Sequence, residues 1–299
     1  MTDGGPAVGF RDMAEGDLRD GLRLSRASGW NQTFEDWRLL LSLGPGLFRV
    51  AVLGGRVVAS GGAVRYGEEL AWICMILVEP GQRGRGLGTR IFDEVLDRVR
   101  PLAEREEVRA VGLDATPAGR GIYLQRGFVD AAASSGPRPG AGPGLVRMRT
   151  EETAGGPSPE VVRPLVASDL DAVLALDRKV FGADRAALLR RALAEAPGLA
   201  RVARAGRVRG YCFGRHGDHA DHVGPVMAED RALARDLVAA CRPSPRPLVL
   251  DARAEPGWLA ALSELGFREQ RPLTRMYLGD RRPLALPALE PAVRGPEFG

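Results

Sequence analysis

Apolar and polar positions fall into clear blocks around one short loop in the first half of the chain. Ala71 to Val78 is a continuous apolar run of strand length, typical of a strand that is covered on both faces. Beyond the loop, apolar residues recur at helical spacing, namely Ile91, Phe92, Val95, Leu96 and Val99. The pattern predicts a strand, a turn and an amphipathic helix that ends near Pro101.

The loop between these two elements reads VEPGQRGRGLGTR, Val78 to Arg90. Its glycines at positions 84, 86 and 88 leave the first amides of the helix uncovered, and Arg83 and Arg85 add positive charge. Free N–H groups and the positive end of a helix dipole bind phosphate. The loop therefore predicts a phosphate site, and a glycine-rich turn without a ligand is the alternative.

The chain also repeats itself along its length. Arg11 to Leu24 matches Arg163 to Leu176 in an arginine, an Asp-Leu pair and later leucines. Further matches follow in the same order: Gly55 to Val58 with Gly206 to Arg209, Leu113 to Ala115 with Leu250 to Ala252, and Leu145 to Met148 with Leu273 to Met276. The sequence thus predicts one kind of domain present twice.

Two stretches rich in glycine and proline interrupt the hydrophobic pattern. The first, TEETAGGPSPE, predicts an N-terminal domain at residues 1–150, a linker at 151–160 and a C-terminal domain at 161–299. The second, at 131–144, has no partner in the second repeat and predicts a surface loop. Within each repeat, the order of predicted helices and strands indicates an α/β (α+β) fold with a mixed sheet and helices on its faces.

Composition narrows the class of protein. A chain of 299 residues with 44% hydrophobic residues is long enough for two domains. Three distant cysteines without a C-x-x-C pair favour neither a disulfide framework nor a zinc finger, and they fit a reducing, cytoplasmic location. No targeting segment or membrane-length apolar run is seen. A net charge of +4, with arginines beside glycines, suits an anionic small molecule better than nucleic acid.

The loop fits neither of two common phosphate motifs. A P-loop needs Gly-Lys followed by Ser or Thr, and a dinucleotide fold needs its third glycine one position later. Instead, R-G-R-G-L-G at Arg83 to Gly88, preceded by Val78-x-Pro80, resembles the pyrophosphate loop of the GNAT superfamily of acyl-CoA-dependent N-acetyltransferases. Y-L-Q-R-G-F at Tyr123 to Phe128 resembles the motif with which that family often closes its domain.

The resemblance implies two GNAT-like domains with mixed, mostly antiparallel sheets, and acetyl-CoA as cosubstrate. It implies that the backbone of Ile76, Leu77 and Val78 pairs with the pantetheine arm. Seven residues would wrap the pyrophosphate: Arg83, Gly84, Arg85, Gly86, Leu87, Gly88 and Thr89. Tyr123, on a helix that Thr116 and Pro117 start, would protonate the departing thiolate, with a purely packing role as the alternative.

The general base and the acceptor are less defined. Glu68 and Glu69, just before the uncharged strand, are better explained as a solvated hairpin tip, so a water or a partly neutral amine would serve instead. The region around Trp30 and Asn31 borders the acceptor site in the family, so both are expected to contact the acceptor, although a core position for Trp30 is equally open. The acceptor is a small-molecule or peptide amine of unknown identity, and an oligomer is compatible with the sequence.

The second repeat lacks the features that carry the resemblance in the first. Val226 to Leu237 has no glycine and places Glu229 and Asp230 at the helix start, where they would repel phosphate. Leu262 stands where the first repeat has Tyr123. This half resembles the degenerate partner domain of tandem members of the family, and one CoA per chain is predicted.

All three histidines of the chain, His216, His219 and His222, lie within seven residues beside two aspartates. Histidine and carboxylate are good zinc ligands. However, Gly217 and the strand-like flanks favour the polar turn of a hairpin, so no metal is predicted.

Taken together, the motifs favour an N-acetyltransferase that moves an acetyl group from acetyl-CoA to a primary amine by direct attack in a ternary complex. The missing base and the degenerate second half leave a second class open, a non-catalytic acyl-CoA-binding or regulatory protein.

Overall fold

The computed structural model describes residues 7–131, 144–151, 161–242 and 244–299. Most of the predicted linker at 151–160 and of the predicted surface loop at 131–144 lies outside the described residues. Two compact units make up the chain, Met1–Val111 and Gly112–Gly299, and the division falls within β5 (Ala110–Ala115).

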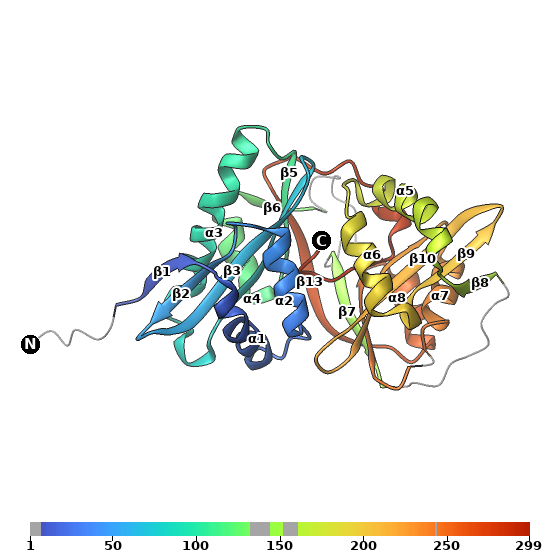
Figure 1. The fold of residues 1–299 in the computed structure, drawn as a ribbon, viewed down its shortest axis with the longest axis horizontal. Helices are drawn as coiled ribbons and strands as arrows, with labels where there is room; N and C mark the ends of the chain where they lie inside the picture. Colours follow the sequence, from blue (N-terminus) through green and yellow to red (C-terminus); the bar gives the residue numbers. More distant parts are fainter. Residues whose placement is uncertain (1–6, 132–143, 152–160, 243) are drawn as a thin grey trace, which may run out of the picture. The chain divides into compact units, whose positions relative to one another are not determined.

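The first unit is an antiparallel sheet with helices packed on it (Figure 1). Its strands run in the order β1 (Gly9–Asp12), β2 (Arg49–Leu53), β3 (Arg56–Tyr66) and β4 (Leu70–Val78). Its helices are α1 (Leu18–Ala27), α2 (Phe34–Leu43) and α3 (Leu87–Glu104). In Figure 1, α1 and α2 cover one face of this sheet and α3 covers the other.

The predicted strand, turn and helix around the glycine-rich loop are confirmed as β4 and α3. The apolar residues that predicted the helix are all buried, namely Ile91, Phe92, Val95, Leu96 and Val99. The helix runs past Pro101 to Glu104, so its predicted end near Pro101 was one turn too early. Proline removes only one N–H, and the carbonyl of Pro101 still accepts a hydrogen bond from the amide of Arg105 at 3.0 Å.

A β-bulge interrupts β4 shortly before the loop. Ser60 lies opposite Leu77 and Gly62 opposite Cys74, so two residues of β4 face only Gly61 on β3. Met75, inside the bulge, has a φ of 57°, and its carbonyl accepts a hydrogen bond from the Ser60 hydroxyl at 3.1 Å. A bulge bends its strand and changes where the following residues point. It therefore sets the direction in which β4 enters the loop.

The second unit contains the longer sheet. Its strands run in the order β5, β13 (Arg268–Leu278), β7 (Leu145–Thr150), β12 (Leu248–Arg253), β14 (Ala292–Val293), β11 (Asp221–Ala228), β10 (Arg207–His216), β9 (Arg201–Ala205) and β8 (Val162–Pro164), while β6 (Phe128–Asp130) also pairs with β13. Its helices are α4 (Pro117–Leu124), α5 (Leu170–Phe181), α6 (Ala186–Glu195), α7 (Arg231–Ala239) and α8 (Pro256–Glu264). Only β11 and β12 pair in parallel among these described strands, so the predicted mixed, mostly antiparallel sheet is confirmed.

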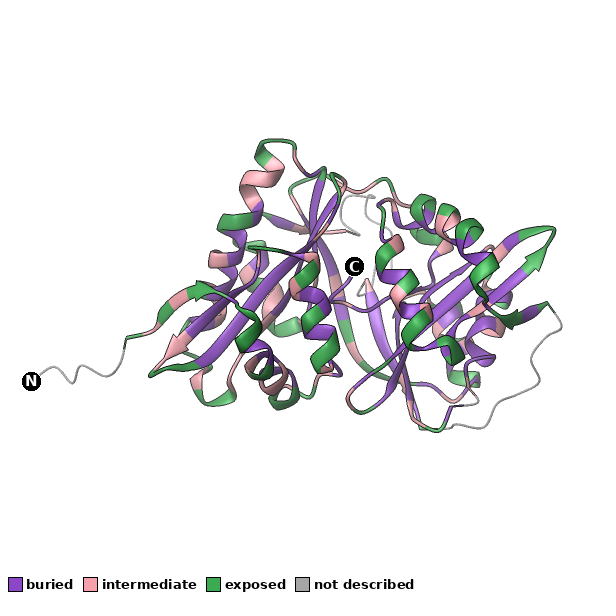
Figure 2. Ribbon diagram, in the orientation of Figure 1, coloured by how far each residue is buried: buried purple, intermediate pink, exposed green. Residues whose placement is uncertain are grey.

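Neighbouring strand residues in this unit point to opposite faces of the sheet. Tyr211, Phe213 and Met227 belong to a cluster formed with residues of α5 and α6. Cys212 and Val226 belong to a separate cluster formed with residues of α7 and α8. Figure 2 shows the strands of both units as largely buried. The period-two alternation of a strand thus supplies a core on each face.

The last strands of the two repeats are exchanged within the second unit. Strand β7, from the first repeat, lies between β12 and β13 of the second repeat, and β13 continues to β5. Asp114 consequently binds Arg275, with oxygen–nitrogen distances of 2.9 and 2.8 Å. Asp251 binds Arg147 in the same way, at 2.9 and 2.7 Å. The predicted domain limits at 150 and 161 stay a prediction.

A second matched pair supports the duplication. Arg11 holds Asp17 with two hydrogen bonds of 2.6 and 2.8 Å, and Arg163 holds Asp169 with two of 2.8 and 2.7 Å. Each aspartate also accepts a backbone N–H three residues earlier in the chain. The arginine hydrogen bonds are the main reason that the pKa of each aspartate lies below its ordinary value. The same Arg–Asp pair, with the same backbone hydrogen bond, thus stands at the start of both repeats.

Candidate functional site

The glycine-rich loop has the backbone geometry of an anion site. Gly84 and Gly86 both have a φ of +74°, which L side chains rarely adopt, and a Cβ on either would meet open space. Gly86 is the N-cap of α3 and supplies no capping side chain. The first turn of the helix holds no acidic residue. The amides of Leu87, Gly88 and Thr89 therefore remain available for an anion, assisted by the helix dipole.

The two arginines of the loop have different surroundings. Arg83 donates to the carbonyl of Val78 at 3.1 Å and to the hydroxyl of Ser28 at 3.1 Å. Arg85 donates to the side-chain oxygen of Gln82 at 3.2 Å. All these arginine contacts are on the exposed surface. Arg83 thus ties the loop to the end of β4 and to the residue after α1, and both guanidinium groups keep donors free for an anion.

Ile76, Leu77 and Val78 lie in the last part of β4, after the bulge. Leu77 is buried, whereas Ile76 and Val78 are partly buried and pack against the cluster that contains Leu87 of α3. Glu79 follows at once and binds Arg23 of α1 at 2.8 Å. The end of β4 is therefore held by packing against α3 and, through Glu79, by an ion pair with α1.

Tyr123 lies on α4, in the second unit. Thr116 caps this helix by accepting the amide of Gly119, and Pro117 is its first residue, as predicted. The Tyr123 ring is buried and lies 6.4 Å from the ring of Phe128, centroid to centroid. A Cβ on Gly119 would lie 2.9 Å from the Tyr123 hydroxyl oxygen, so glycine provides the room for that hydroxyl. Burial raises the pKa of Tyr123 well above its ordinary value, which keeps the hydroxyl protonated.

Glu68 and Glu69 lie in the turn between β3 and β4. Glu69 binds Arg109 at 2.9 Å, and the carbonyls of both glutamates accept backbone N–H groups from residues 109 and 110. Glu68 is exposed. Both are therefore part of a hairpin tip, and neither is placed here as a base.

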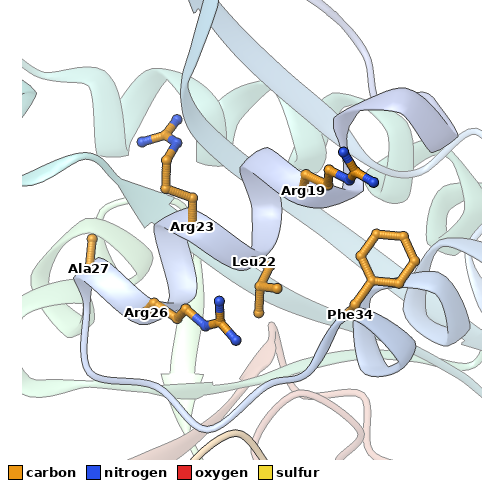
Figure 3. A pocket seen from close by; sticks show the side chains of 6 residues that line it. All are labelled: Arg19, Leu22, Arg23, Arg26, Ala27 and Phe34. Atoms are coloured by element: carbon orange, nitrogen blue, oxygen red, sulfur yellow. The ribbon is translucent and has the colours of Figure 1, made fainter.

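Trp30 and Asn31 lie in the connection between α1 and α2. Trp30 is half-buried and Asn31 is only 1% exposed. Their expected contact with an acceptor stays a prediction. A separate cavity, here called the α1 cavity, is formed by α1 and the first residue of α2, and its lining residues are Arg19, Leu22, Arg23, Arg26, Ala27 and Phe34 (Figure 3).

The corresponding turn of the second repeat is closed by side chains. Asp230 is the N-cap of α7, and its carboxylate accepts the amide of Leu233 at 2.8 Å. Glu229 binds Arg207 and Arg209. Leu262, the counterpart of Tyr123, is fully buried on α8. The helix start is thus occupied by protein carboxylates, which weakens any attraction for phosphate.

The space between β11 and β12 is also filled by the chain itself. These strands pair directly only at Asp221 with Leu248 and at His222 with Val249. Beyond that point β14 lies between them and pairs with both strands. Pro291 accepts hydrogen bonds from the Trp258 indole at 2.9 Å and from the amide of Arg253 at 2.8 Å. Most of segment 290–299 is buried, although it contains three charged residues.

Each of those charged side chains has polar partners inside the second unit. Glu290 binds Arg185 and Arg253, each at 3.0 Å. Glu297 binds Arg215 at 2.8 Å. Arg294 donates to the carbonyls of Gly214 and Gly224 at 2.9 and 3.2 Å. A buried charge that lacks such partners is strongly destabilising, so these contacts make segment 290–299 an integral part of the second unit.

The histidines belong to the predicted hairpin, which β10 and β11 form. His216 binds Asp221 at 3.0 Å, and the buried His222 binds Asp251 at 3.0 Å, so the two rings have different partners. Over the described ranges, no group of three His, Cys, Asp or Glu side chains is arranged to hold a metal ion. None of the helices within these ranges is both long and apolar enough to cross a bilayer.

Sequence reasoning missed two features that shape these sites. The bulge at Met75 had a signal, because Gly61 and Gly62 stand in the middle of a strand, where glycine often marks a bulge or a close approach. A Cβ on Gly61 would lie 2.6 Å from the Ile76 side chain. The role of segment 290–299 had no comparable signal, because its two glycines, two prolines and three charged residues are typical of an exposed stretch.

Comparisons with known proteins agree with this geometry. Residues 14–128 match a family model described as the acetyltransferase (GNAT) family, and residues 173–286 match one described as an acetyltransferase (GNAT) domain. A holothin acyltransferase from Pseudoalteromonas sp. (strain SANK 73390) is 27% identical over 258 residues, which is 85% of this chain and 82% of the relative.

Solved structures show the same fold at low identity. A putative acetyltransferase from Pyrococcus horikoshii has a TM-score of 0.77 at 20% identity, covering 100% of this chain and 98% of its own. A tandem GNAT protein from the clavulanic acid biosynthesis pathway has a TM-score of 0.57 at 17% identity, covering 91% of this chain and 98% of its own.

Proposed function

The chain belongs to the GNAT acetyltransferase family as a tandem acyl-CoA-dependent N-acyltransferase, and from this premise we propose that it transfers the acetyl group of acetyl-CoA to a primary amine. The observation that carries the proposal is the uncapped start of α3, where Gly84 and Gly86 adopt left-handed backbone and no acidic residue competes for the amides. These residues fit a pyrophosphate by charge and by free donors.

Acetyl-CoA would supply the acyl group as a thioester. The amides of Leu87, Gly88 and Thr89, with the side chains of Arg83 and Arg85, would bind its pyrophosphate, and the backbone of Ile76 to Val78 would hold its pantetheine arm. This places the whole cosubstrate on the loop and on the end of β4, whose position the bulge and Glu79 fix.

Transfer would proceed by direct attack in a ternary complex. The amine nitrogen forms a bond to the acyl carbon, the carbon–sulfur bond breaks, and the thiolate leaves with a proton from Tyr123. Burial raises the pKa of Tyr123, so the phenol is protonated throughout the physiological range and carries the proton that this step needs. A water would take up the proton that the amine nitrogen loses on forming the amide bond, and solvent would return a proton to the Tyr123 phenolate. An amine that reaches the site already neutral needs no base before it attacks.

The acceptor is proposed to be a small-molecule or peptide amine. One relative is described as acting on holothin, so holothin is a reasonable member of any acceptor panel for this chain. Cytoplasmic location and the oligomeric state stay predictions.

The test is a coupled assay of thiol release from acetyl-CoA with a panel of amines that includes holothin. Turnover with any amine, together with the acetylated product by mass spectrometry, would support the proposal. Tight CoA binding without turnover on the whole panel would contradict it and would favour a non-catalytic acyl-CoA-binding or regulatory role. A crystal of the protein with CoA would then reveal which groups surround the sulfur.

A further inference from the structure

The α1 cavity combines positive charge with an apolar floor. Its volume is about 760 Å³, within the range of small-molecule sites. Three of its lining residues are apolar and three are arginines, and none of the six carries a carboxylate. In Figure 3, Leu22 lies in the middle, with Arg26 on one side of it and Arg19 and Phe34 on the other.

The nearby acidic residues are already bound to other arginines. Arg23, whose side chain points away from Leu22 in Figure 3, binds Asp20 at 3.0 Å, Glu79 at 2.8 Å and the carbonyl of Val57 at 2.6 Å. Glu35, next to Phe34, binds Arg38. The charge of Arg23 is therefore balanced within the protein.

Arg19 is the clearest source of uncompensated charge. It is exposed, and within the described part of the chain its side chain makes no hydrogen bond or ion pair. A guanidinium group presents several donors in a plane that matches a carboxylate. Phe34, 36% exposed, offers an apolar surface beside it.

The helix that lines the cavity is tied by hydrogen bonds to the loop that would hold the acyl donor. Ala27, at one end of the cavity, precedes Ser28, whose hydroxyl accepts a hydrogen bond from Arg83 at 3.1 Å. Arg23 makes a second link, through Glu79 at the end of β4. A molecule in the α1 cavity would thus lie on the helix that is fastened to the phosphate loop.

We infer that the α1 cavity selects acceptor amines in which a carboxylate is attached to an apolar body. The carboxylate pairs with Arg19, and the apolar body lies against Leu22 and Phe34. This inference rests on the proposed function, because only a transferase has an acceptor. The binding preference itself can be measured without turnover.

The experiment uses two probes that differ only in charge, 4-(aminomethyl)benzoate and 4-(aminomethyl)benzamide. Their affinities for the full chain are measured by calorimetry in the presence of CoA, and their kcat/KM values by thiol release from acetyl-CoA. The carboxylate is expected to bind about tenfold more tightly, in line with one charge-assisted hydrogen-bonded pair.

Variants then separate charge from packing. Arg19→Glu should reverse the preference between the two probes, and Arg19→Lys should keep most of it. Phe34→Ala should weaken both probes to the same extent. Arg268→Glu is the matched control, because Arg268 is an exposed arginine on β13 whose side chain makes no hydrogen bond or ion pair within the described residues and does not line the cavity.

Three results would overturn the inference: no binding of either probe, equal binding of both, or a preference that Arg19→Glu leaves intact. A rise in the dissociation constant of CoA by the same factor in Arg19→Glu would also overturn it, because the cavity would then serve the phosphates of the cosubstrate. Failure of the proposed function looks different, since it would abolish thiol release with every amine while leaving the charge preference in binding.

Discussion

The turn between β4 and α3 and the turn between β11 and α7 occupy corresponding places in the two repeats, yet they present opposite chemistry. The first has left-handed glycines, flanking arginines and an uncapped helix. The second has Asp230 bound to the amide of Leu233, with Glu229 beside it. Both turns complete the same strand–helix unit, but only the first leaves backbone donors for a ligand.

The comparison separates what the fold needs from what a ligand needs. A helix start is satisfied by a capping carboxylate, which is why Asp230 stabilises α7. An uncapped start costs stability unless water or a ligand supplies the missing partners. The uncapped start of α3 is therefore the stronger indication of function. In the second repeat, β14 lies between β11 and β12 and is a second obstacle to binding a cosubstrate there, besides the capping carboxylate.

The largest effect is expected from closing the loop at Gly86. In Gly86→Val, a β-branched side chain must adopt a φ near that of Gly86, +74°, and it covers the amides of the first turn. Loss of two charge-assisted hydrogen bonds would raise the dissociation constant of CoA roughly 10³-fold by calorimetry.

Gly206 offers a matched control in the second repeat, because it has the same φ of +74° and open space around it. Gly206→Val should cost a similar amount of stability while leaving CoA affinity unchanged. Equal CoA affinity in Gly86→Val and the wild type would remove the phosphate site from the loop.

The next effect concerns catalysis. Tyr123→Phe is expected to lower kcat roughly 10²-fold while the KM for acetyl-CoA changes little, because only the proton donor is removed. Since the pKa of Tyr123 is raised by burial, its ionisation should not produce a loss of activity between pH 7 and about pH 10. Tyr277→Phe, another buried tyrosine of the second unit, serves as the control. An unchanged kcat in Tyr123→Phe would show that water protonates the thiolate.

Local elements around the site could be predicted because their signals are local. The apolar run of β4, the helical spacing of α3 and the Thr116-Pro117 start of α4 each depend on neighbouring residues. The duplicated Arg–Asp pair at the start of each repeat was visible for the same reason. What such patterns predict well is the element and its buried face.

The exchange of β7 and β13 could not be predicted in this way. Each repeat carries an aspartate in L-D-A and an arginine in its last strand, so pairing within a repeat and pairing between repeats satisfy the same local pattern. Only the long-range sheet order decides that Asp114 meets Arg275. Segment 290–299 was missed similarly, because its partners Arg185 and Arg215 are far away in the sequence.

The exchanged ion pairs should matter more for stability than for binding. Although burial alone would raise it, Arg147 and His222 hold the pKa of Asp251 well below its ordinary value. Arg147→Met leaves the buried Asp251 carboxylate with only His222 of these two partners. It should lower the free energy of unfolding by about 3–5 kcal/mol in urea titrations. Arg275→Met should do the same through Asp114, whereas Arg38→Met, in an exposed pair, should cost no more than about 1 kcal/mol. If both buried variants lost less than about 1 kcal/mol, the ion pairs between the exchanged strands would contribute little to stability.

A smaller effect should appear at acid pH. Arg11 and Arg163 lower the pKa of Asp17 and Asp169. The folded-state pKa is below the unfolded value of about 3.9, so this stabilisation is fully present above roughly pH 5 and is lost as the pH falls through the folded-state pKa. Asp17→Asn and Asp169→Asn should each cost about 1–2 kcal/mol at pH 7 and show a shallower decline in stability between pH 5 and pH 2. Parallel pH profiles for the variants and the wild type would refute this.

The smallest effect is expected from removing the carboxylates at the start of α7. The chain should bind one CoA, and the double variant Glu229→Gln, Asp230→Gly removes the like charge and uncaps the helix. Its stoichiometry should nevertheless stay at one, because β14 still pairs with both β11 and β12, and the buried ion pairs of Glu290 and Glu297 hold segment 290–299 in place. Calorimetric titration gives the number of sites, and Gly86→Val in the same background should bring it to nearly none. A second site appearing in the double variant would show that charge alone separates the two turns, and a second site already present in the wild type would end the view of the second repeat as a copy without a cosubstrate.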